Sequence, residues 1–474
     1  MNPKRSVYLF IVPALLLAGC GDPIEQHVQE VMAGGDGREE ALMDLLFAKT
    51  QALPAILQAL EDTSQSTRGR TDLVEVLWQI YLRETDARIL PALIALIDDP
   101  DPQVRRAVPL SLASMGKKES IHPLLKQLAV EQDEKIQLQL LVALELLDEW
   151  DVVHTYTSSY GTNRFTITGG EELTPEEKIQ FTNLVVSMYE TAAMDTLQQL
   201  AEEMFEKIVG QIVGEADNRI LKADLIGAEE LYLEALALKP DSKNAGMRYG
   251  KFQFFEGDRQ QGLEILETHG MVLHVPRLQQ APTINGDLSD PAWAQAAKID
   301  RFYQSLPRMR VVPAEVRAEV YLGYTDSSLY AAYKVYDDTR ILAAKHTIRD
   351  SRNDWDDSIV FGFDTNLDLS TYYNVRVNCI GTITDSYSSK NPDESRPAAW
   401  NGVHNVSTRV EPAHWALEME VPIKSLGDAQ IRKGDIWGCN ISPARVGRGG
   451  APDLWVPTYG RFSRPDRFGL LVFD

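Results

Sequence analysis

Few residues in this sequence have the types and the spacing that catalysis requires. Asp356 and Asp357 are adjacent, so on a strand their carboxylates would point to opposite faces and would not work as an acid/base pair. The sequence has neither a Gly-x-Ser-x-Gly elbow nor a phosphate-binding loop, and Gly447 to Gly450 follows no nucleotide-binding pattern. We therefore expect a binding protein and not an enzyme.

The usual metal-binding signatures are also missing from the sequence. There is no paired Cys-x-x-Cys and no His-Glu-x-x-His, so the common zinc sites are excluded. Residues 364–368 begin like an EF-hand loop, but Leu369 stands where glycine is needed and Val375 where glutamate is needed. The EF-hand is excluded, while a structural calcium ion in a loop of the C-terminal half stays open.

The first twenty residues have the pattern of an export signal. Lys4 and Arg5 precede an apolar run from Val7 to Leu17, which is too short to span a bilayer. The run ends in Leu-Ala-Gly-Cys, which resembles the bacterial lipobox. The resemblance implies that residues 1–19 are removed and that Cys20 is acylated, which would hold the protein on a membrane. An ordinary secretory signal with a chance cysteine is the alternative.

The residues after Cys20 bear on localisation. By the same resemblance, Gly21 in place of an aspartate favours the outer membrane of a bacterial cell envelope. Residues 20–37 are rich in glycine and have little periodicity, so we expect a tether with at most one short helix.

Charge divides the chain into two halves. The 474 residues carry a net charge of -22, which excludes a nucleic-acid-binding protein because that class needs a basic surface. Residues 20–272 hold 22 basic and 44 acidic side chains, whereas residues 273–474 hold 23 and 25. Six of the eight tryptophans lie in the second stretch. We expect the two halves to differ in fold.

Residues 38–150 show helical periodicity in repeats. Three segments align around Pro54, Pro91 and Pro123, which are 37 and 32 residues apart, and proline is tolerated in the first turn of a helix. An acidic, proline-containing turn at residues 98–102 is followed by a new helix with two arginines. The pattern resembles HEAT repeats, which implies stacked helix pairs that share one core.

Residues 151–175 interrupt the repeats and predict a long loop or a small hairpin, and helices resume in residues 176–272. Near the end of this region, Asp224 recurs as Asp258, 34 residues later, together with neighbouring acidic and apolar residues. This period resembles the tetratricopeptide repeat, and a generic helical hairpin is the alternative. Both repeat types imply surfaces for protein partners, such as another envelope protein.

From residue 273 the apolar residues alternate with a period of two. Successive stripes of this kind, separated by turn signals, are typical of half-buried strands. The stripes run through residues 314–324, 329–335, 359–363, 373–379, 415–421 and 437–441. We therefore expect an antiparallel β-sandwich over residues 273–474, so that an α-helical repeat region is followed by a sandwich.

Two cysteines lie in these stripes. Cys379 alternates with Val377, and Cys439 alternates with Trp437 and Ile441, which predicts that both thiols are buried in a sheet. We favour two separate thiols, while a disulfide stays open because an exported chain occupies an oxidising compartment.

Several short sequence segments of this half match segments of a known family and occur in the same order. They are Ile284 to Trp293, Tyr324 to Tyr330, Trp355 to Val360, Tyr372 to Asn378, Trp415 to Glu418 and the closing Phe468-Gly469. The set resembles carbohydrate-binding module family 9. The resemblance implies a sandwich that binds a sugar ring between aromatic side chains and holds its hydroxyl groups with charged or amide side chains. The resemblance also allows a structural calcium ion in a loop of the sandwich.

The resemblance assigns roles to particular residues. Trp355 falls at the position where the family has its first stacking tryptophan. Arg376 and Asn378 fall on the strand whose arginine contacts sugar hydroxyls in the family, and alternation places both side chains away from the core. The second stacking tryptophan is missing, and its place falls near Phe462, with Trp455 as a substitute. Trp355 is a ligand platform or a rim residue, and Arg376 is a ligand contact or one partner of a surface ion pair.

These observations favour a lipid-anchored envelope protein that presents a glycan-binding sandwich on a helical-repeat arm. The alternative is a structural or assembly lipoprotein whose repeats bind a protein partner and whose sandwich has lost sugar binding. The missing second tryptophan motivates that alternative.

Overall fold

The computed structural model describes residues 22–148, 153–158, 161–166, 175–305, 311–314, 316–351, 356–388, 398–446, 452–459 and 462–474. The chain divides into two compact units, residues 1–204 and residues 205–474. In the part of the chain that is described, no helix combines the length and the apolar character needed to cross a membrane.

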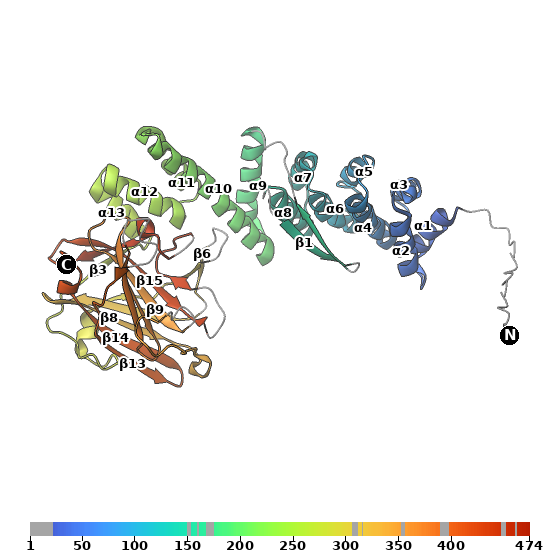
Figure 1. Cartoon of the computed structure of the whole chain (residues 1–474). Helices are drawn as coiled ribbons and strands as arrows, with labels where there is room; N and C mark the ends of the chain where they lie inside the picture. The colour runs from blue at the N-terminus through green and yellow to red at the C-terminus, as the bar shows by residue number, and fades with distance from the viewer. Residues whose placement is uncertain are drawn as a thin grey trace, which may run out of the picture. The chain divides into compact units, whose positions relative to one another are not determined.

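The first unit consists mainly of paired helices (Figure 1). The long helices α4, α6 and α8 pack against one another, and each also packs against the short helix before it. Pro54, Pro91 and Pro123 all lie in the first turn of a short helix, as predicted. The helices are α1 (Pro23–Ala33), α2 (Arg38–Ala48), α3 (Leu53–Glu61), α4 (Thr67–Arg83), α5 (Ile89–Ala95), α6 (Pro102–Ser114), α7 (Ile121–Leu128) and α8 (Glu134–Asp148).

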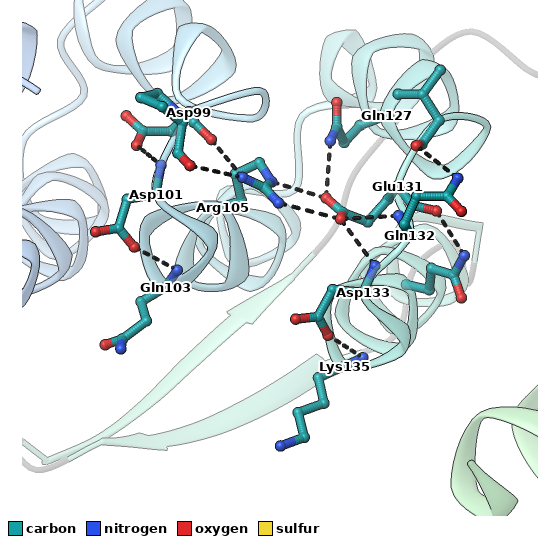
Figure 2. A network of polar contacts seen from close by, with 12 residues as sticks. Asp99, Asp101, Gln103, Arg105, Gln127, Glu131, Gln132, Asp133 and Lys135 are labelled. Atoms are coloured by element: carbon teal, nitrogen blue, oxygen red, sulfur yellow. Dashed lines mark hydrogen bonds and ion pairs between the residues drawn. The ribbon is translucent and has the colours of Figure 1, made fainter. Parts of the chain in front are cut away.

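Arginine–carboxylate pairs connect consecutive repeats. Arg70 and Arg105 are each the fourth residue of a long helix, α4 and α6 respectively. Arg70 pairs with Asp99, and both side chains are buried. Arg105 donates through Nε to Glu131 at 2.9 Å and through Nη1 to the carbonyl oxygen of Asp99 at 2.8 Å (Figure 2). Each long helix is thereby joined to the turn that begins the next one.

The start of the described chain is more ordered than a tether. Asp22 caps α1 by accepting a hydrogen bond from the backbone N–H of Ile24, and Pro23 occupies the first turn. Val28 and Val31 are buried, and α1 packs against α2 and α4. The short helix was expected, but its packing was not, because two apolar residues three positions apart make a weak periodic signal.

A hairpin occupies the range predicted as a loop or hairpin. Strands β1 (Val153–Ser158) and β2 (Gly161–Thr166) pair in antiparallel register. They are followed by α9 (Pro175–Thr191) and α10 (Asp195–Leu221).

Three helices of the second unit directly precede the sandwich in the chain. They are α11 (Leu225–Leu238), α12 (Lys243–Glu256) and α13 (Arg259–Thr268). Asp224 and Asp258, the residues that recur 34 positions apart, are the N-caps of α11 and α13. The period therefore marks equivalent helix starts. Met247 and Phe254 of α12 and Leu266 of α13 belong to the same buried cluster as the strands, and α11 packs against α12.

Two sheets form the predicted β-sandwich. Neighbouring strands are antiparallel except for β17 and β3, which are parallel. The seven-stranded sheet has the order β12 (Ala398–Ala399), β11 (Ile383–Ser388), β10 (Tyr372–Asn378), β9 (Ser358–Asp364), β15 (Ile436–Ala444), β17 (Gly469–Phe473), β3 (Val272–Val275). The five-stranded sheet has the order β13 (Asn405–Glu411), β14 (His414–Pro422), β8 (Ser328–Val335), β7 (Ala318–Tyr324), β4 (Ala297–Ile299). A small sheet joins β16 (Asp453–Leu454), β5 (Tyr303–Ser305) and β6 (Val311–Pro313).

Glu418 explains why two distant sequence phrases belong together. This residue of β14 is fully buried. Its carboxylate accepts hydrogen bonds from the backbone N–H groups of Asn285, Gly286 and Leu288 and from Nε1 of Trp293, at 2.6 to 3.0 Å. The turn that opens the sandwich is thus fixed by one carboxylate from a strand more than a hundred residues later.

Lys251 on α12 is a buried cation whose Nζ has no hydrogen-bond partner among the described residues. Burial lowers the pKa of this lysine from 10.5 to about 8, although Asp364 and Asp466 oppose the change. Between pH 8 and 10.5 the unfolded chain binds a proton here that the folded chain does not, so stability rises with pH in that window.

We therefore expect Lys251→Met to stabilise the second unit at pH 7 by about 3 kcal/mol, the free-energy equivalent of this pKa difference. The gain should shrink as the pH rises from 8 to 10.5. Urea unfolding at several pH values measures it, and a gain that did not depend on pH would contradict the assignment.

Candidate functional site

Four neighbouring strands of the seven-stranded sheet have a second, partly polar face. Its residues on β10 and β11 are partly exposed, and those on β9 and β15 are buried. Two rows of directly opposed residues cross this face, and we call them together the outer face. They are Thr384–Arg376–Val360–Ser442 and Ser386–Asn374–Gly362–Asn440. Val375, Phe361 and Ile441, which alternate with these residues, belong to the buried core. Both rows therefore point to the opposite side of the sheet.

Arg376 lies on β10 near the middle of the outer face, between Val360 and Thr384. Its side chain is half-buried, and Nη1 donates to Oγ of Ser358 at 3.4 Å. A guanidinium carries five N–H donors in a fixed plane, so it can hold hydroxyl oxygens of a ligand in addition to a protein acceptor. The predicted position of Arg376 away from the core is confirmed.

Phe462 lies on the same side of the sheet. A Cβ atom at Gly362 would be 3.2 Å from Cζ of Phe462, so the glycine lets the ring approach the strand closely. The ring is half-buried and lies 5.7 Å from the ring of Phe468, between centroids. The structure thus brings Phe462 and Arg376, both predicted site residues, onto one face.

Asn374 is an outer-face residue that the sequence analysis missed. It lies two positions before Arg376 on β10, opposite Gly362. Its Oδ1 atom is buried and has no hydrogen-bond partner among the described residues. A buried acceptor without a donor costs folding free energy, which makes Asn374 a candidate ligand contact. The alternation that placed Arg376 on this face would also have identified Asn374.

Asn378 does not fit its predicted role. It was expected to face away from the core toward a ligand, but its side chain is fully buried. Its Nδ2 donates to Oδ2 of Asp356 at 2.8 Å and to the carbonyl oxygen of His346 at 2.9 Å. Its Oδ1 accepts from the N–H of Thr382 at 2.7 Å. Asn378 therefore fastens the end of β10 to a neighbouring loop.

Trp455 is also placed differently from the prediction. It is 5% exposed and belongs to the apolar core, where its ring packs against Gly469. The backbone N–H of Trp455 donates to the carbonyl oxygen of Ile441 on β15. The proposed substitution of Trp455 for the second stacking tryptophan is wrong. The other two predicted residues, Trp355 and Cys20, lie outside the described part of the chain.

The adjacent carboxylates have structural roles. Asp356 accepts hydrogen bonds from the N–H groups of Lys345 and His346, and these bonds help to keep its pKa below the usual range despite burial. Asp357 accepts from the N–H of Ala343 instead. Both residues precede β9, and both carboxylates accept from the backbone of residues 343–346, so each has a structural role. Within the described residues, no group of three or more His, Cys, Asp or Glu side chains could hold a metal ion.

The two sandwich cysteines are separate buried thiols, as favoured by the sequence. Cys379 directly follows β10 and Cys439 lies on β15, and strand β9 lies between these two strands. Burial raises the pKa of Cys379 to about 12 and that of Cys439 well above its usual value. A disulfide between them is excluded in this structure.

We expect neither thiol of the Cys20→Ser chain to react with Ellman's reagent at pH 8 in the folded state, because the thiolate is the reactive form. Both should react once guanidinium unfolds the sandwich. Rapid modification of one thiol without denaturant would show that its burial or its pKa is wrong.

Comparison with known proteins gives one match at the level of families. A family model for HEAT repeats matches residues 53–145, which span α3 to α8, and this confirms the predicted HEAT-like repeats. No curated protein matches the sequence.

Three solved structures with similarity to the chain are of two kinds. A carbohydrate-binding module of family 9 from Caldicellulosiruptor kristjanssonii, in complex with cellotriose, is 18% identical, with 43% of this chain and 93% of that chain covered and a TM-score of 0.34. A candidate carbohydrate-binding protein from Bacteroides uniformis is 18% identical, with 43% and 100% covered and a TM-score of 0.37. Human deoxyhypusine hydroxylase is 17% identical, with 52% and 90% covered and a TM-score of 0.24. The fold of this chain is therefore assigned from its own sheets and helices, and not from these similarities.

Proposed function

We propose that the sandwich binds a neutral sugar ring on the outer face, with Phe462 as a stacking ring and Arg376 as a donor to sugar hydroxyls. The observation that carries the proposal is the position of both side chains on one face of the seven-stranded sheet. A sugar ring presents C–H groups to an aromatic face and hydroxyl groups at its edge, so it needs this combination of neighbours. Trp355, three residues before β9, is proposed as the second platform.

Asn374 supports a neutral ligand over an anionic one. Its Oδ1 atom can only accept a hydrogen bond, and a sugar hydroxyl can donate one whereas a carboxylate cannot. Arg376, on the same face of the same strand, can donate to the oxygen of a neighbouring hydroxyl. Since the Asn374 oxygen is covered in this structure, a covering side chain has to move when the hydroxyl enters.

We further propose that the protein acts without catalysis, attached to a bacterial cell envelope through lipid on Cys20, with the outer membrane favoured. The lipobox-like residues 17–20 motivate this attachment. Cys20→Ser should move the protein from the membrane fraction to the soluble fraction. Continued membrane association of a correctly cleaved Cys20→Ser protein would refute the lipid anchor.

Calorimetric titration with cello- and xylo-oligosaccharides tests the sugar site. We expect Arg376→Ala and Phe462→Ala each to weaken binding about tenfold or more, since a stacking or charged contact contributes about 1–3 kcal/mol. Arg409→Ala is the matched control, because this exposed arginine lies on β13 of the other sheet. Unchanged binding by Arg376→Ala would contradict the proposed site.

The same titration with Asn374→Leu separates a ligand contact from a structural residue. Removal of an unpartnered acceptor should leave the free energy of unfolding unchanged or raise it by about 1 kcal/mol, while sugar binding falls. A loss of stability would show that the asparagine has a structural partner.

The second candidate function is a scaffold that binds a protein through its helices. The exposed apolar residues Ile226 and Leu233 on α11 favour it. Oligosaccharide titration discriminates the two, because a scaffold with a silent sandwich would show no heat of binding with any oligosaccharide.

A further inference from the structure

Helix α11 exposes apolar side chains along one stripe. Ile226 is 76% exposed and Leu233 is 48% exposed, and they lie seven residues apart, which places them on the same helix face. Glu230 and Ala237, at the intermediate and following positions, are also exposed. The opposite side of α11 is packed, and Tyr232 there is fully buried. We call Ile226, Glu230, Leu233 and Ala237 together the α11 stripe.

The period of 34 residues supplies an internal comparison. Helix α13 begins at the equivalent cap, so Gln260, Glu264 and Glu267 correspond to Ile226, Glu230 and Leu233. All three α13 residues are exposed as well. At equivalent positions one helix therefore has only polar side chains, and the other has two large apolar ones. Helix formation and packing do not require Ile226 and Leu233 to be apolar.

Charge restricts what can cover the stripe. Glu230 lies within it and Glu234 follows Leu233, and neither makes an ion pair among the described residues, whereas Glu215 and Asp224 nearby are paired with Arg219. A second copy of this chain would bring an identical acidic stripe against it, and an anionic membrane would be repelled for the same reason.

We infer that the α11 stripe is a docking surface for a basic amphipathic helix of a partner protein. Two apolar anchors at helical spacing, Ile226 and Leu233, match the apolar face of such a helix. Glu230 and Glu234 then face its lysine or arginine side chains. The inference does not depend on sugar binding by the sandwich.

Fluorescence anisotropy with the full chain tests the inference, using a labelled 18-residue leucine–lysine peptide designed as an amphipathic helix. Two peptides are controls: one with the same composition in scrambled order, and one with glutamate in place of lysine. We expect the amphipathic lysine peptide to bind at least tenfold more tightly than either control. The double variant Ile226→Gln/Leu233→Glu, which copies the residues of α13, should lose at least tenfold of that affinity.

Ile348→Gln is the matched variant, because Ile348 is 74% exposed and lies in a loop of the sandwich. It should bind the peptide as the wild type does. Equal binding of all three peptides, or unchanged binding by the α11 double variant, would overturn the inference. Sedimentation of both proteins provides a second check, since a dimer that only the double variant loses would show that a second copy occupies the stripe.

Discussion

Replacement of Glu418 by glutamine is expected to lower the free energy of unfolding of the second unit by about 3–5 kcal/mol. The buried carboxylate accepts four hydrogen bonds, three from the backbone N–H groups of one turn and one from Trp293. Glutamine keeps the size but has one acceptor oxygen, and its NH₂ group would face N–H donors. Donors left unpaired in the interior carry the full cost of their lost solvation.

Glu420→Gln provides the control for this prediction. Glu420 lies two residues along β14 but is partly exposed, and it accepts from Oγ of Ser328 and Nδ2 of Asn405. A glutamine there should cost less than about 1 kcal/mol. Guanidinium unfolding followed by tryptophan fluorescence measures both. Equal effects of the two substitutions would contradict the role given to Glu418.

The second large effect is expected in the helical repeats. Arg70→Met should destabilise the first unit by about 3–5 kcal/mol, because it leaves the buried carboxylate of Asp99 without its cation. The double variant Arg70→Met/Asp99→Leu should recover much of the loss, since a buried ion pair contributes little beyond an apolar pair of similar volume.

Hydrogen exchange resolved by mass spectrometry locates this effect. We expect faster exchange in α4 and α6 of Arg70→Met, with the sandwich strands unaffected. Arg88→Met is the control, because Arg88 pairs with Asp86 at the surface and such pairs contribute little. If α4 and α6 exchanged no faster in Arg70→Met than in the control, the Arg70–Asp99 pair would not stabilise the contact between these repeats.

Periodicity in the sequence predicted most of the sandwich. The stripes through residues 359–363 and 373–379 became β9 and β10, with alternate residues in the core. Alternation also placed Arg376 correctly, because a residue in the middle of a strand has its direction set by its neighbours. The same signal would have identified Asn374.

Asn378 and Trp455 were misplaced for different physical reasons. Asn378 is the last residue of β10, and its side chain bonds to His346, 32 residues earlier in the chain, and to Asp356, 22 residues earlier. No local pattern contains either contact. Trp455 lies outside any alternating stripe, and its burial depends on the close approach that Gly469 permits.

The sequence of the helical half predicted the repeats, but it did not predict where the first unit ends and the second begins. The 34-residue spacing of Asp224 and Asp258 was visible because capping residues recur at helix starts. The grouping of α11 to α13 with the sandwich was not visible, because it depends on side chains such as Met247 that pack against distant strands.

A crystal structure of the full chain soaked with cellotriose tests the central proposal most directly. We predict a sugar ring on the outer face of the seven-stranded sheet, with its C–H groups against Phe462 and a hydroxyl within 3.2 Å of Arg376, the usual limit of a hydrogen bond. The Asn374 oxygen should then have a hydroxyl partner. A ligand bound elsewhere, or an outer face that stays empty at saturating cellotriose, would contradict the account.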